Sequence, residues 1–283
     1  MSFRFLFITS DPEVAAFAIA SGVDRIFLDL EINGKQERQG HLDTVVSRHS
    51  VADVARLRPV VPAGALLTRI NPVHDGTEDE VDAVLRGGAD VVMLPMFHGP
   101  REVERFVAAV GGRARTCLLI ETVGAAESLP ECLSVPGVDE AHIGLNDLHL
   151  GLGMTFMFEP LADGLVDHLA EVLTERRIPF GIGGVARAGE GLLPAELLLG
   201  EHARLGSTAA ILSRTFHRRA GSVAEIQGQM DFALEVEKLR AAYRAHLGAS
   251  ARSLALVHEE VRRRVGGIVS ELKTRKVAGA AGA

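Results

Sequence analysis

Short apolar runs alternate with longer amphipathic segments through the first 220 residues of this 283-residue chain. Within the runs, apolar positions do not alternate with polar ones, which is typical of strands buried on both faces of a parallel sheet. We expect strands over residues 3–8, 25–30, 65–70, 91–95, 117–120, 141–144, 179–182 and 208–213. Eight strand–helix units in series predict an α/β protein, and closure into a (β/α)₈ TIM barrel is its natural architecture.

Helices are expected between these strands, and additional C-terminal helices are expected after them. The first barrel helix is predicted to end at about residue 20. The others are predicted to cover residues 78–85, 101–110, 125–133, 161–176 and 194–203. Thr77 and Glu80 have the spacing of a capping box for one of them. Two further helical patterns run from about 223 to 247 and from 253 to 273, which is more than an eighth barrel helix needs.

These patterns predict three parts of the chain. Residues 1–220 form the barrel and catalytic domain, 221–275 form a helical extension, and 276–283 form a flexible tail of small residues. The extension is expected either to pack across a neighbouring subunit or to cap the chain's own barrel.

Composition and charge exclude several classes of partner. The net charge of −7 and the absence of tryptophan argue against binding of nucleic acid. No apolar run reaches the ~18–20 residues that a membrane span needs, so no membrane partner is expected. The first residues lead directly into a strand-like run, and we therefore expect a cytoplasmic protein. Cys117 and Cys132 are expected to act as small buried hydrophobic residues.

Two acidic residues follow neighbouring predicted strands. Glu121 comes directly after strand 117–120, and Asp147 comes just beyond strand 141–144. Because parallel strands end at the same edge of a barrel, the two carboxylates are expected to face one cleft. Such a pair of oxygen ligands suits a partly hydrated Mg²⁺ ion, and Mn²⁺ or Co²⁺ equally well. The alternative is that each acid pairs with an arginine or caps the next helix.

The ends of strands two and three carry further candidates. Arg69 ends strand 65–70, and its guanidinium can hold an oxyanion or a carboxylate. It can also form an ion pair with Glu31 or Glu121. The polar loop 32–50 is too long to be only a connector. Within it, His41 is either a general base or an exposed loop histidine, and His49 is expected at the surface.

Two stretches of backbone are candidate anion sites. The N–H groups around Leu145, Asn146 and Asp147 are expected to bind a substrate carboxylate. The glycine-rich turn Gly181–Gly184 follows strand seven and either receives an anion or simply turns the chain.

The segment IETVGAAESLPECLSVPGVDEAHIGLNDLHLGLG, residues 120–153, resembles the metal-binding core of the HpcH/HpaI aldolase and citrate lyase β-subunit family. The shared features are the Glu-Thr pair, the Pro-Gly-Val-Asp turn and the Asp-Leu dipeptide at 147–148. Leu145 stands where the family usually has proline, and His149 and Gly151 stand where serines are common. None of these departures removes an acid, and a looser resemblance extends over residues 1–220.

The resemblance implies a divalent-metal-dependent class II aldolase. Such an enzyme makes or breaks a carbon–carbon bond between the enolate of a pyruvate-type 2-oxo acid and an aldehyde. Glu121 and Asp147 would ligate the metal, and Arg69 would match the family's substrate-binding arginine. Asp29 and Glu31 resemble an Asp-x-Glu motif that supports the metal's water shell or hydrogen-bonds to that arginine. The family also implies a homo-oligomer, a trimer or hexamer.

The residue after Glu31 departs from both branches of the family. Aldolases place a histidine there and citrate-lyase-like members an aspartate, whereas this chain has Ile32. Lys35 and Arg38 resemble residues of the citrate-lyase-like branch, so a lyase or synthase of CoA thioesters is the first alternative. A non-catalytic barrel that binds an oxo acid is the second.

Overall fold

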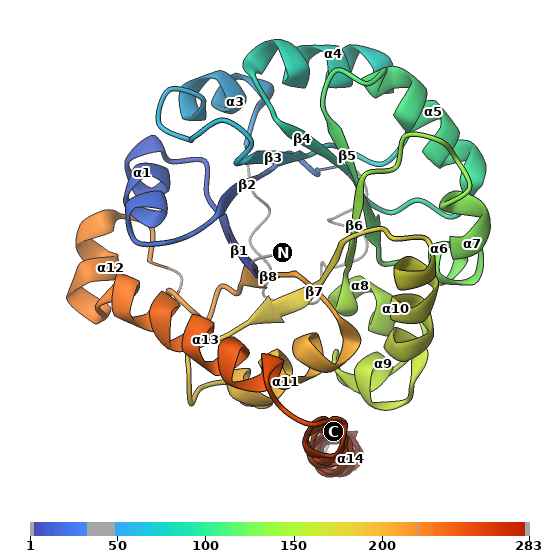
Figure 1. Ribbon diagram of the computed structural model, residues 1–283, viewed down its shortest axis with the longest axis vertical. Coiled ribbons are helices and arrows are strands. Elements are labelled where there is room, and N and C mark those ends of the chain that lie inside the picture. Colours follow the sequence, from blue (N-terminus) through green and yellow to red (C-terminus); the bar gives the residue numbers. More distant parts are fainter. Residues whose placement is uncertain (1–2, 33–48, 219, 281–283) are drawn as a thin grey trace.

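The computed structural model describes residues 3–32, 49–218 and 220–280, with side chains up to residue 275. Its eight parallel strands follow one another in chain order and close into a barrel, with the last strand beside the first (Figure 1). The strands are β1 (Arg4–Ile8), β2 (Arg25–Asp29), β3 (Leu66–Arg69), β4 (Val91–Leu94), β5 (Arg115–Ile120), β6 (Glu140–Ile143), β7 (Phe180–Val185) and β8 (Ala209–Leu212). The predicted (β/α)₈ barrel is therefore confirmed.

Helices surround the barrel as an outer ring (Figure 1). The first group is α1 (Pro12–Ala20), α3 (Val51–Leu57), α4 (Thr77–Gly87), α5 (Pro100–Val110), α6 (Val123–Glu127), α7 (Leu129–Cys132) and α8 (Leu145–Gly151). The second group is α9 (Glu159–Ala162), α10 (Leu165–Glu175), α11 (Ala195–Leu205), α12 (Val223–Gln229), α13 (Phe232–Leu247) and α14 (Ala251–Ala280).

Three helices that the sequence predicts as continuous are each divided in two. Segment 161–176 is interrupted by Gly164, whose φ of 98° is left-handed, so α9 and α10 are separate. Segment 125–133 divides into α6 and α7 around Ser128, and Pro130 in the first turn of α7 lacks the N–H that a continuous helix needs. Extended backbone at Met230 separates α12 from α13.

The capping box predicted at Thr77 is wrong. The residue before α4 is Gly76, and the Thr77 hydroxyl donates to the carbonyl of His74 instead of capping the helix. Glu80 reaches outward from the helix: its Oε1 accepts hydrogen bonds from the backbone and side-chain nitrogens of Asn71, at 3.2 and 2.8 Å. The carboxylate therefore stabilises the loop after β3 and contributes nothing to the cap.

Apolar side chains form two layers. The larger lies between the strands and the helices, where nearly every strand residue facing outward is buried. The smaller fills the middle of the barrel with Leu6, Phe27, Leu67, Val91, Met93, Cys117, Leu119 and Ala209. Both cysteines are buried free thiols, as expected, and burial raises the pKa of each above its ordinary value.

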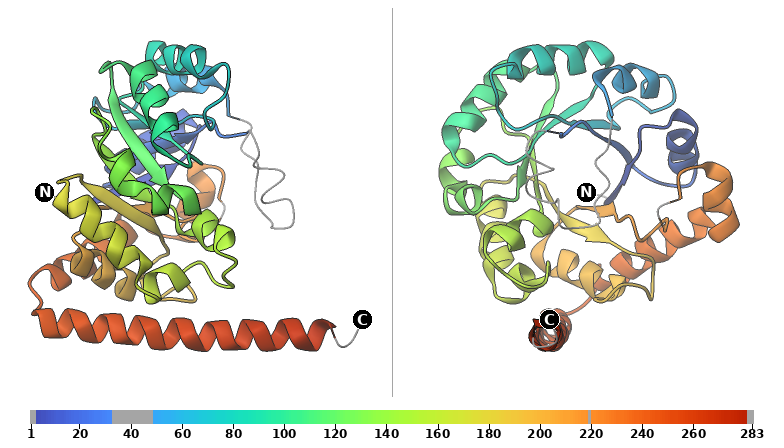
Figure 2. Two further views of the ribbon diagram at one scale, coloured as in Figure 1. Left: turned by 90° about the vertical axis from the view of Figure 1, so that its right-hand side faces the viewer. Right: turned by 180° about the vertical axis from the view of Figure 1, so that it is seen from behind.

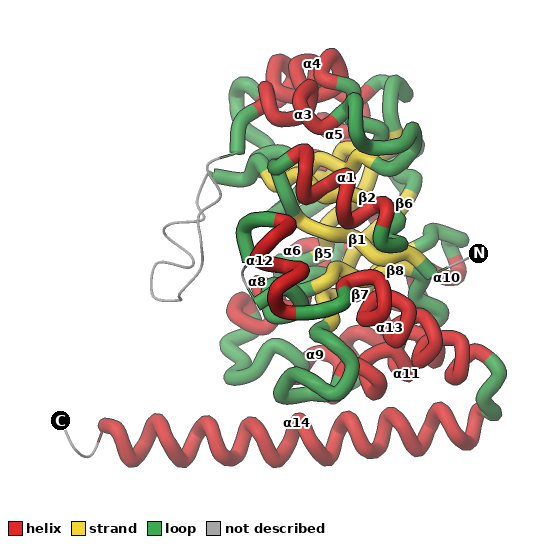
Figure 3. Tube along the Cα trace, turned by 90° about the vertical axis from the view of Figure 1, so that its left-hand side faces the viewer, coloured by secondary structure: helices red, strands yellow, loops and turns green. Residues whose placement is uncertain are grey.

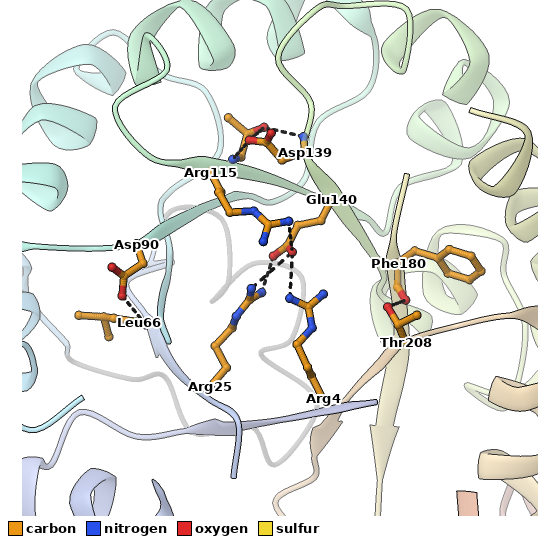
Figure 4. Close-up of polar contacts among 10 residues, drawn as sticks. Arg4, Arg25, Leu66, Asp90, Arg115, Asp139, Glu140, Phe180 and Thr208 are labelled. Carbon is orange, nitrogen blue, oxygen red and sulfur yellow. Dashed lines mark hydrogen bonds and ion pairs between the residues drawn. The ribbon is translucent and has the colours of Figure 1, made fainter. Parts of the chain in front are cut away.

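The N-terminal end of the barrel is closed by a buried ion cluster (Figure 4). Both carboxylate oxygens of Glu140, in β6, accept hydrogen bonds from the guanidinium of Arg25, in β2. Nitrogens of Arg115 and Arg4 lie 3.1 and 3.4 Å from its Oε2. Burial opposes ionisation of Glu140, but the three arginines hold its pKa below the usual range. Because this end is filled by side chains that pair with one another, a site for a ligand is expected at the other end.

The C-terminal helices pack against the chain's own barrel (Figure 2). In α13, Arg240 donates to the carbonyl of Phe3 at 3.0 Å, and the Tyr243 hydroxyl donates to that of Ser207 at 3.2 Å. The 30-residue α14 lies along α11 and α9 (Figure 3). It reaches Ala280, further than predicted, and a contact with a second subunit stays a prediction.

No helix in the described part of the chain combines the length and the apolar character needed to cross a lipid bilayer.

Candidate functional site

The C-terminal ends of β2 and β3 bring Arg69 and Asp29 together. The two residues are paired in register, and the guanidinium donates from Nε and Nη2 to the two Asp29 oxygens at 2.9 and 2.8 Å. Glu31 lies 3.1 Å from the same Nη2. Burial opposes the charge of Arg69, but Asp29 and then Glu31 raise its pKa above the ordinary value. The guanidinium is therefore a permanent cation with a fixed plane.

Residues around this ion pair fix the loop ends that carry it. The Asn71 side-chain oxygen accepts from the backbone N–H of Ile32 at 2.9 Å, which ties the end of β2 to the end of β3. Glu80 in turn holds Asn71 from α4. The guanidinium carbon of Arg69 also lies over the face of the Phe27 ring, 5.6 Å from its centroid, in a cation–π contact. These contacts leave Arg69 little freedom to change its orientation.

Glu121 follows β5 and is 4% exposed. Its Oε1 accepts the backbone N–H of Met96 at 3.2 Å, and Met96 has a left-handed φ of 52°, the kind of backbone strain that is often found at functional sites. A side chain at Gly144 would place its Cβ 3.0 Å from Glu121 Oε2, so only glycine leaves room for the carboxylate. Burial first, and then Asp147 and Glu31, raise the pKa of Glu121 to about 8 against the pull of Arg69.

Asp147 lies in the first turn of α8, directly after β6. Strands β5 and β6 are neighbours in register, so both acids are at the same rim of the barrel, and their charges interact. Acidic groups exceed basic ones here: Glu121, Asp147, Glu31 and Asp29 gather around the single guanidinium of Arg69 within the described residues. A divalent cation would relieve that excess, so the residues fit a metal ion.

The fit involves few protein ligands. Across residues 3–32, 49–218 and 220–275, no group of three or more histidine, cysteine or acidic side chains is arranged to hold a metal. Glu121 and Asp147 would therefore leave most positions around an ion to water and substrate, as Mg²⁺ prefers.

The backbone N–H groups expected to contact an anion lie in the first turn of α8. The N–H of Leu148 is the first in α8 to bond back to the Gly144 carbonyl. The N–H groups of Leu145, Asn146 and Asp147 precede it and begin the helix. Their role in binding a substrate carboxylate stays a prediction.

Loop 33–48, which carries His41, Lys35, Arg38 and Asp43, lies outside the described residues. His49 does not: its Nδ1 lies 2.9 Å from the Asp29 carbonyl, and the residue is half-buried, so the surface position expected for it is wrong. A carbonyl can only accept, which makes Nδ1 the donor and leaves Nε2 as the basic nitrogen. No sequence pattern predicts this contact, since it joins His49 to a strand end that lies 20 residues earlier in the chain.

The turn predicted at Gly181–Gly184 is wrong, because these glycines lie within β7, where two of them contact their surroundings closely. Gly183 accepts a hydrogen bond from His142 Nε2 at 3.0 Å, and a Cβ at Gly181 would overlap the His142 ring at 2.3 Å. Gly181 therefore makes space for a buried histidine of β6, whereas a Cβ at Gly183 would meet Leu145 at 3.0 Å. Whether the backbone of Gly181–Gly184 also binds an anion stays a prediction.

The family model of HpcH/HpaI aldolase/citrate lyase matches residues 4–159, more than half of the chain. The chain belongs to the HpcH/HpaI aldolase/citrate lyase family. Members of this family are aldolases and lyases. Asp29, Glu31, Arg69, Glu121 and Asp147 all lie inside the matched range, whereas β7, β8 and the C-terminal helices lie beyond it. None of the curated proteins matches the sequence.

Solved structures of the HpcH/HpaI type share the fold. CitE from Mycobacterium tuberculosis, in complex with magnesium and pyruvate, is 18% identical with a TM-score of 0.62, covering 92% of this chain and 97% of its own. An HpcH/HpaI aldolase from Desulfitobacterium hafniense DCB-2 is 16% identical with a TM-score of 0.60, covering 84% and 93%. The citrate synthase SbnG is 17% identical with a TM-score of 0.57, covering 85% and 94%.

Proposed function

We propose that this protein is a divalent-metal-dependent carbon–carbon lyase of the class II aldolase type. Its substrates would be a pyruvate-type 2-oxo acid and an aldehyde. The observation that carries the proposal is the buried carboxylate of Glu121, which lies among other acids beside one fixed guanidinium. Similarity to CitE, whose structure holds magnesium and pyruvate, supports the same choice of cofactor and substrate.

Glu121 and Asp147 would hold the metal, with Mg²⁺, Mn²⁺ or Co²⁺ as candidates. The bound ion would supply Lewis-acid stabilisation of the negative charge that develops on the oxo acid. In the metal-free chain, Glu121 retains its proton at neutral pH because its pKa is raised to about 8. Loading of the ion should therefore release a proton from this carboxyl.

Arg69 would bind the substrate. Its Nε and Nη2 are occupied by Asp29, so the arginine is already oriented before the substrate arrives. A preoriented cation stabilises the enolate oxygen more than the ketone oxygen from which it forms, because negative charge grows on that oxygen during the reaction. Asp29 and Glu31 would act through Arg69 by fixing its plane.

A proton must also leave the hydroxyl group of the aldol. His49 is a candidate for the base because the Asp29 carbonyl holds its Nδ1–H and leaves Nε2 as acceptor. His41 stays a second candidate, since it lies outside the described residues.

Cleavage or synthesis of a CoA thioester stays the first alternative, and it rests on Lys35 and Arg38. A non-catalytic barrel that binds an oxo acid stays the second. The cytoplasmic location and the homo-oligomeric state also stay predictions.

The deciding experiment is a screen of pyruvate against a panel of aldehydes with Mg²⁺, Mn²⁺ or Co²⁺, alongside acetyl-CoA with glyoxylate. Metal-dependent turnover of pyruvate and an aldehyde, absent in Asp147→Ala, is expected. Asp163→Ala, at an exposed turn before α10, is the matched control and should retain full activity. Undiminished turnover in EDTA would contradict the metal role, and turnover of only the thioester pair would select the alternative.

A further inference from the structure

Arg187, just beyond β7, is a buried cation with two donor nitrogens that lack a hydrogen-bond partner among the described residues. The residue is 7% exposed, and its Nε and Nη2 have no hydrogen-bond partner in the described part of the chain. Glu190 Oε1 lies 3.2 Å from Nη2, close enough for an ion pair, but not in line with an N–H bond. Burial of unsatisfied guanidinium donors is costly, so a buried arginine in this state points to a missing acceptor.

Two further arginines lie at the same place. Strands β7 and β8 are paired at Val185 and Leu212, so the loops that follow them are neighbours. Arg218 donates to Glu190 at 3.1 Å, and Glu190, Arg214 and Arg218 line a surface pocket of about 420 Å³. Gly191 and Thr215 complete its wall. Arg187 lies behind this wall, in contact with Glu190. Among the described residues, this group therefore holds three arginines and one carboxylate.

The ion cluster at the opposite end of the barrel shows what a purely structural arrangement looks like. There, Arg4, Arg25 and Arg115 all converge on Glu140, and among the described residues none of them has a buried nitrogen without a hydrogen-bond partner. The contrast lies in the partners: the three arginines converge on one carboxylate, whereas Arg187 has a planar pair of donors without a hydrogen-bond partner. That planar fork matches the oxygens of a phosphate or carboxylate.

We propose that the loops after β7 and β8 form an anion-binding subsite for the terminal phosphate or carboxylate of the co-substrate. The assignment rests on the proposed aldolase function. The subsite is at the same rim as Asp147, which follows β6, the neighbour of β7. At ~4.8 Å between adjacent strands, the two strand ends are separated by about 5–10 Å, the length of a short carbon chain. An aldehyde with a charged end could thus contact both sites.

Direct binding of inorganic phosphate to the metal-free protein tests the subsite without any turnover. Isothermal titration at constant ionic strength should give binding to the unaltered chain and a Kd at least tenfold weaker in Arg187→Gln and Arg214→Gln. Arg262→Gln, which removes the same charge from the exposed face of α14, should bind as the unaltered chain does. Because Arg214 is only half-buried, its variant keeps the test decisive if Arg187→Gln does not fold. Equal affinity in all variants, or no phosphate binding at all, would overturn the subsite.

Kinetics then tests the substrate assignment. With pyruvate and Mg²⁺, the KM for glyceraldehyde 3-phosphate should rise at least tenfold in Arg214→Gln, while the KM for glyceraldehyde stays unchanged. If phosphate binding depends on Arg214 but both KM values move equally, the pocket takes a free anion and the substrate assignment is wrong. If no aldehyde turns over while phosphate binding is still lost in the variants, the subsite stands and the aldolase function fails.

Discussion

Arg69 grips both oxygens of Asp29, from Nε at 2.9 Å and from Nη2 at 2.8 Å, at the ends of two adjacent strands. A lysine has one compact ammonium group and cannot reproduce this planar contact. We therefore expect Arg69→Lys to lower kcat/KM by about 10²–10³-fold, the scale of a lost oxyanion donor. Steady-state kinetics with saturating metal measures the change.

A matched control exists elsewhere in the chain. Arg105 makes the same two-pronged contact with Glu78, with both distances 2.8 Å, but at the surface between α5 and α4. Arg105→Lys should leave kcat/KM unchanged. Equal losses in the two variants would show that the effect is general instability and would remove the proposed role of Arg69.

Glu121→Gln should stabilise the metal-free protein and prevent metal binding. A carboxyl whose folded-state pKa is raised to about 8 favours unfolding as pH rises above its ordinary value near 4.5, because the unfolded chain ionises first. Removing that ionisation should increase the free energy of unfolding in EDTA at pH 7 by about 3 kcal/mol. Urea unfolding measures stability, and titration with Mn²⁺ measures binding. A stability that is unchanged or decreased at pH 7 would contradict the raised pKa.

His49→Gln should lower kcat by ~10²-fold or more, the usual scale for loss of a general base. Glutamine can still donate to the Asp29 carbonyl, but it has no basic nitrogen to accept a proton. His168→Gln, on the exposed face of α10, is the control. An unchanged kcat in His49→Gln would leave His41 as the candidate base.

Glu140→Ala should destabilise the fold without impairing the site. Removing one partner of a buried ion cluster leaves uncompensated charge, at a cost of about 3–5 kcal/mol. Arg25, whose side chain is 6% exposed, would be the residue left unpaired. The midpoint of urea unfolding should fall, and the activity of the remaining folded protein should be normal. Glu104→Ala, at an exposed position of α5, should change neither. A Glu140→Ala protein as stable as the unaltered chain would show that the cluster is not structural.

Acid should destabilise the protein through two buried histidines. Burial lowers the pKa of His142 to about 4 and of His202 to about 3, so both are neutral in the fold at pH 7. Their contribution is fully present above the unfolded pKa near 6.5 and is lost as pH falls toward the folded values, because the unfolded chain binds protons first. By pH 5 each should have cost about 2 kcal/mol.

Urea unfolding in EDTA at pH 7 and pH 5 measures this loss. Glu121→Gln is the suitable background, because Glu121 acts with the opposite sign over the same range. His202→Gln should show a smaller drop, and His168→Gln the full one. An equal drop in both variants would contradict the assignment to His202.

Much of the fold follows from local pattern. Unbroken apolar runs indicate strands that are buried on both faces of a sheet. Eight such runs in series correctly predicted the closed barrel. The same pattern failed inside helices: Gly164 and Met230 break segments that look continuous, because a helix's end depends on how its turn packs as well as on its residues. Glu80 likewise fits a capping box by spacing, yet it binds Asn71, which only the fold brings within reach.

What the sequence by itself determined is which side chains stand where strands end: Arg69, Glu121 and Asp147 each follow an apolar run, and parallel strands end together. What only the tertiary structure decided is which other residues those side chains contact. Arg69 contacts Asp29, and His49 contacts the carbonyl of the same residue. The raised pKa of Glu121 and the unpartnered donors of Arg187 likewise depend on residues brought together by the fold. Periodicity is a local property and reports burial, whereas these contacts arise when the barrel closes and sets distant strand ends side by side.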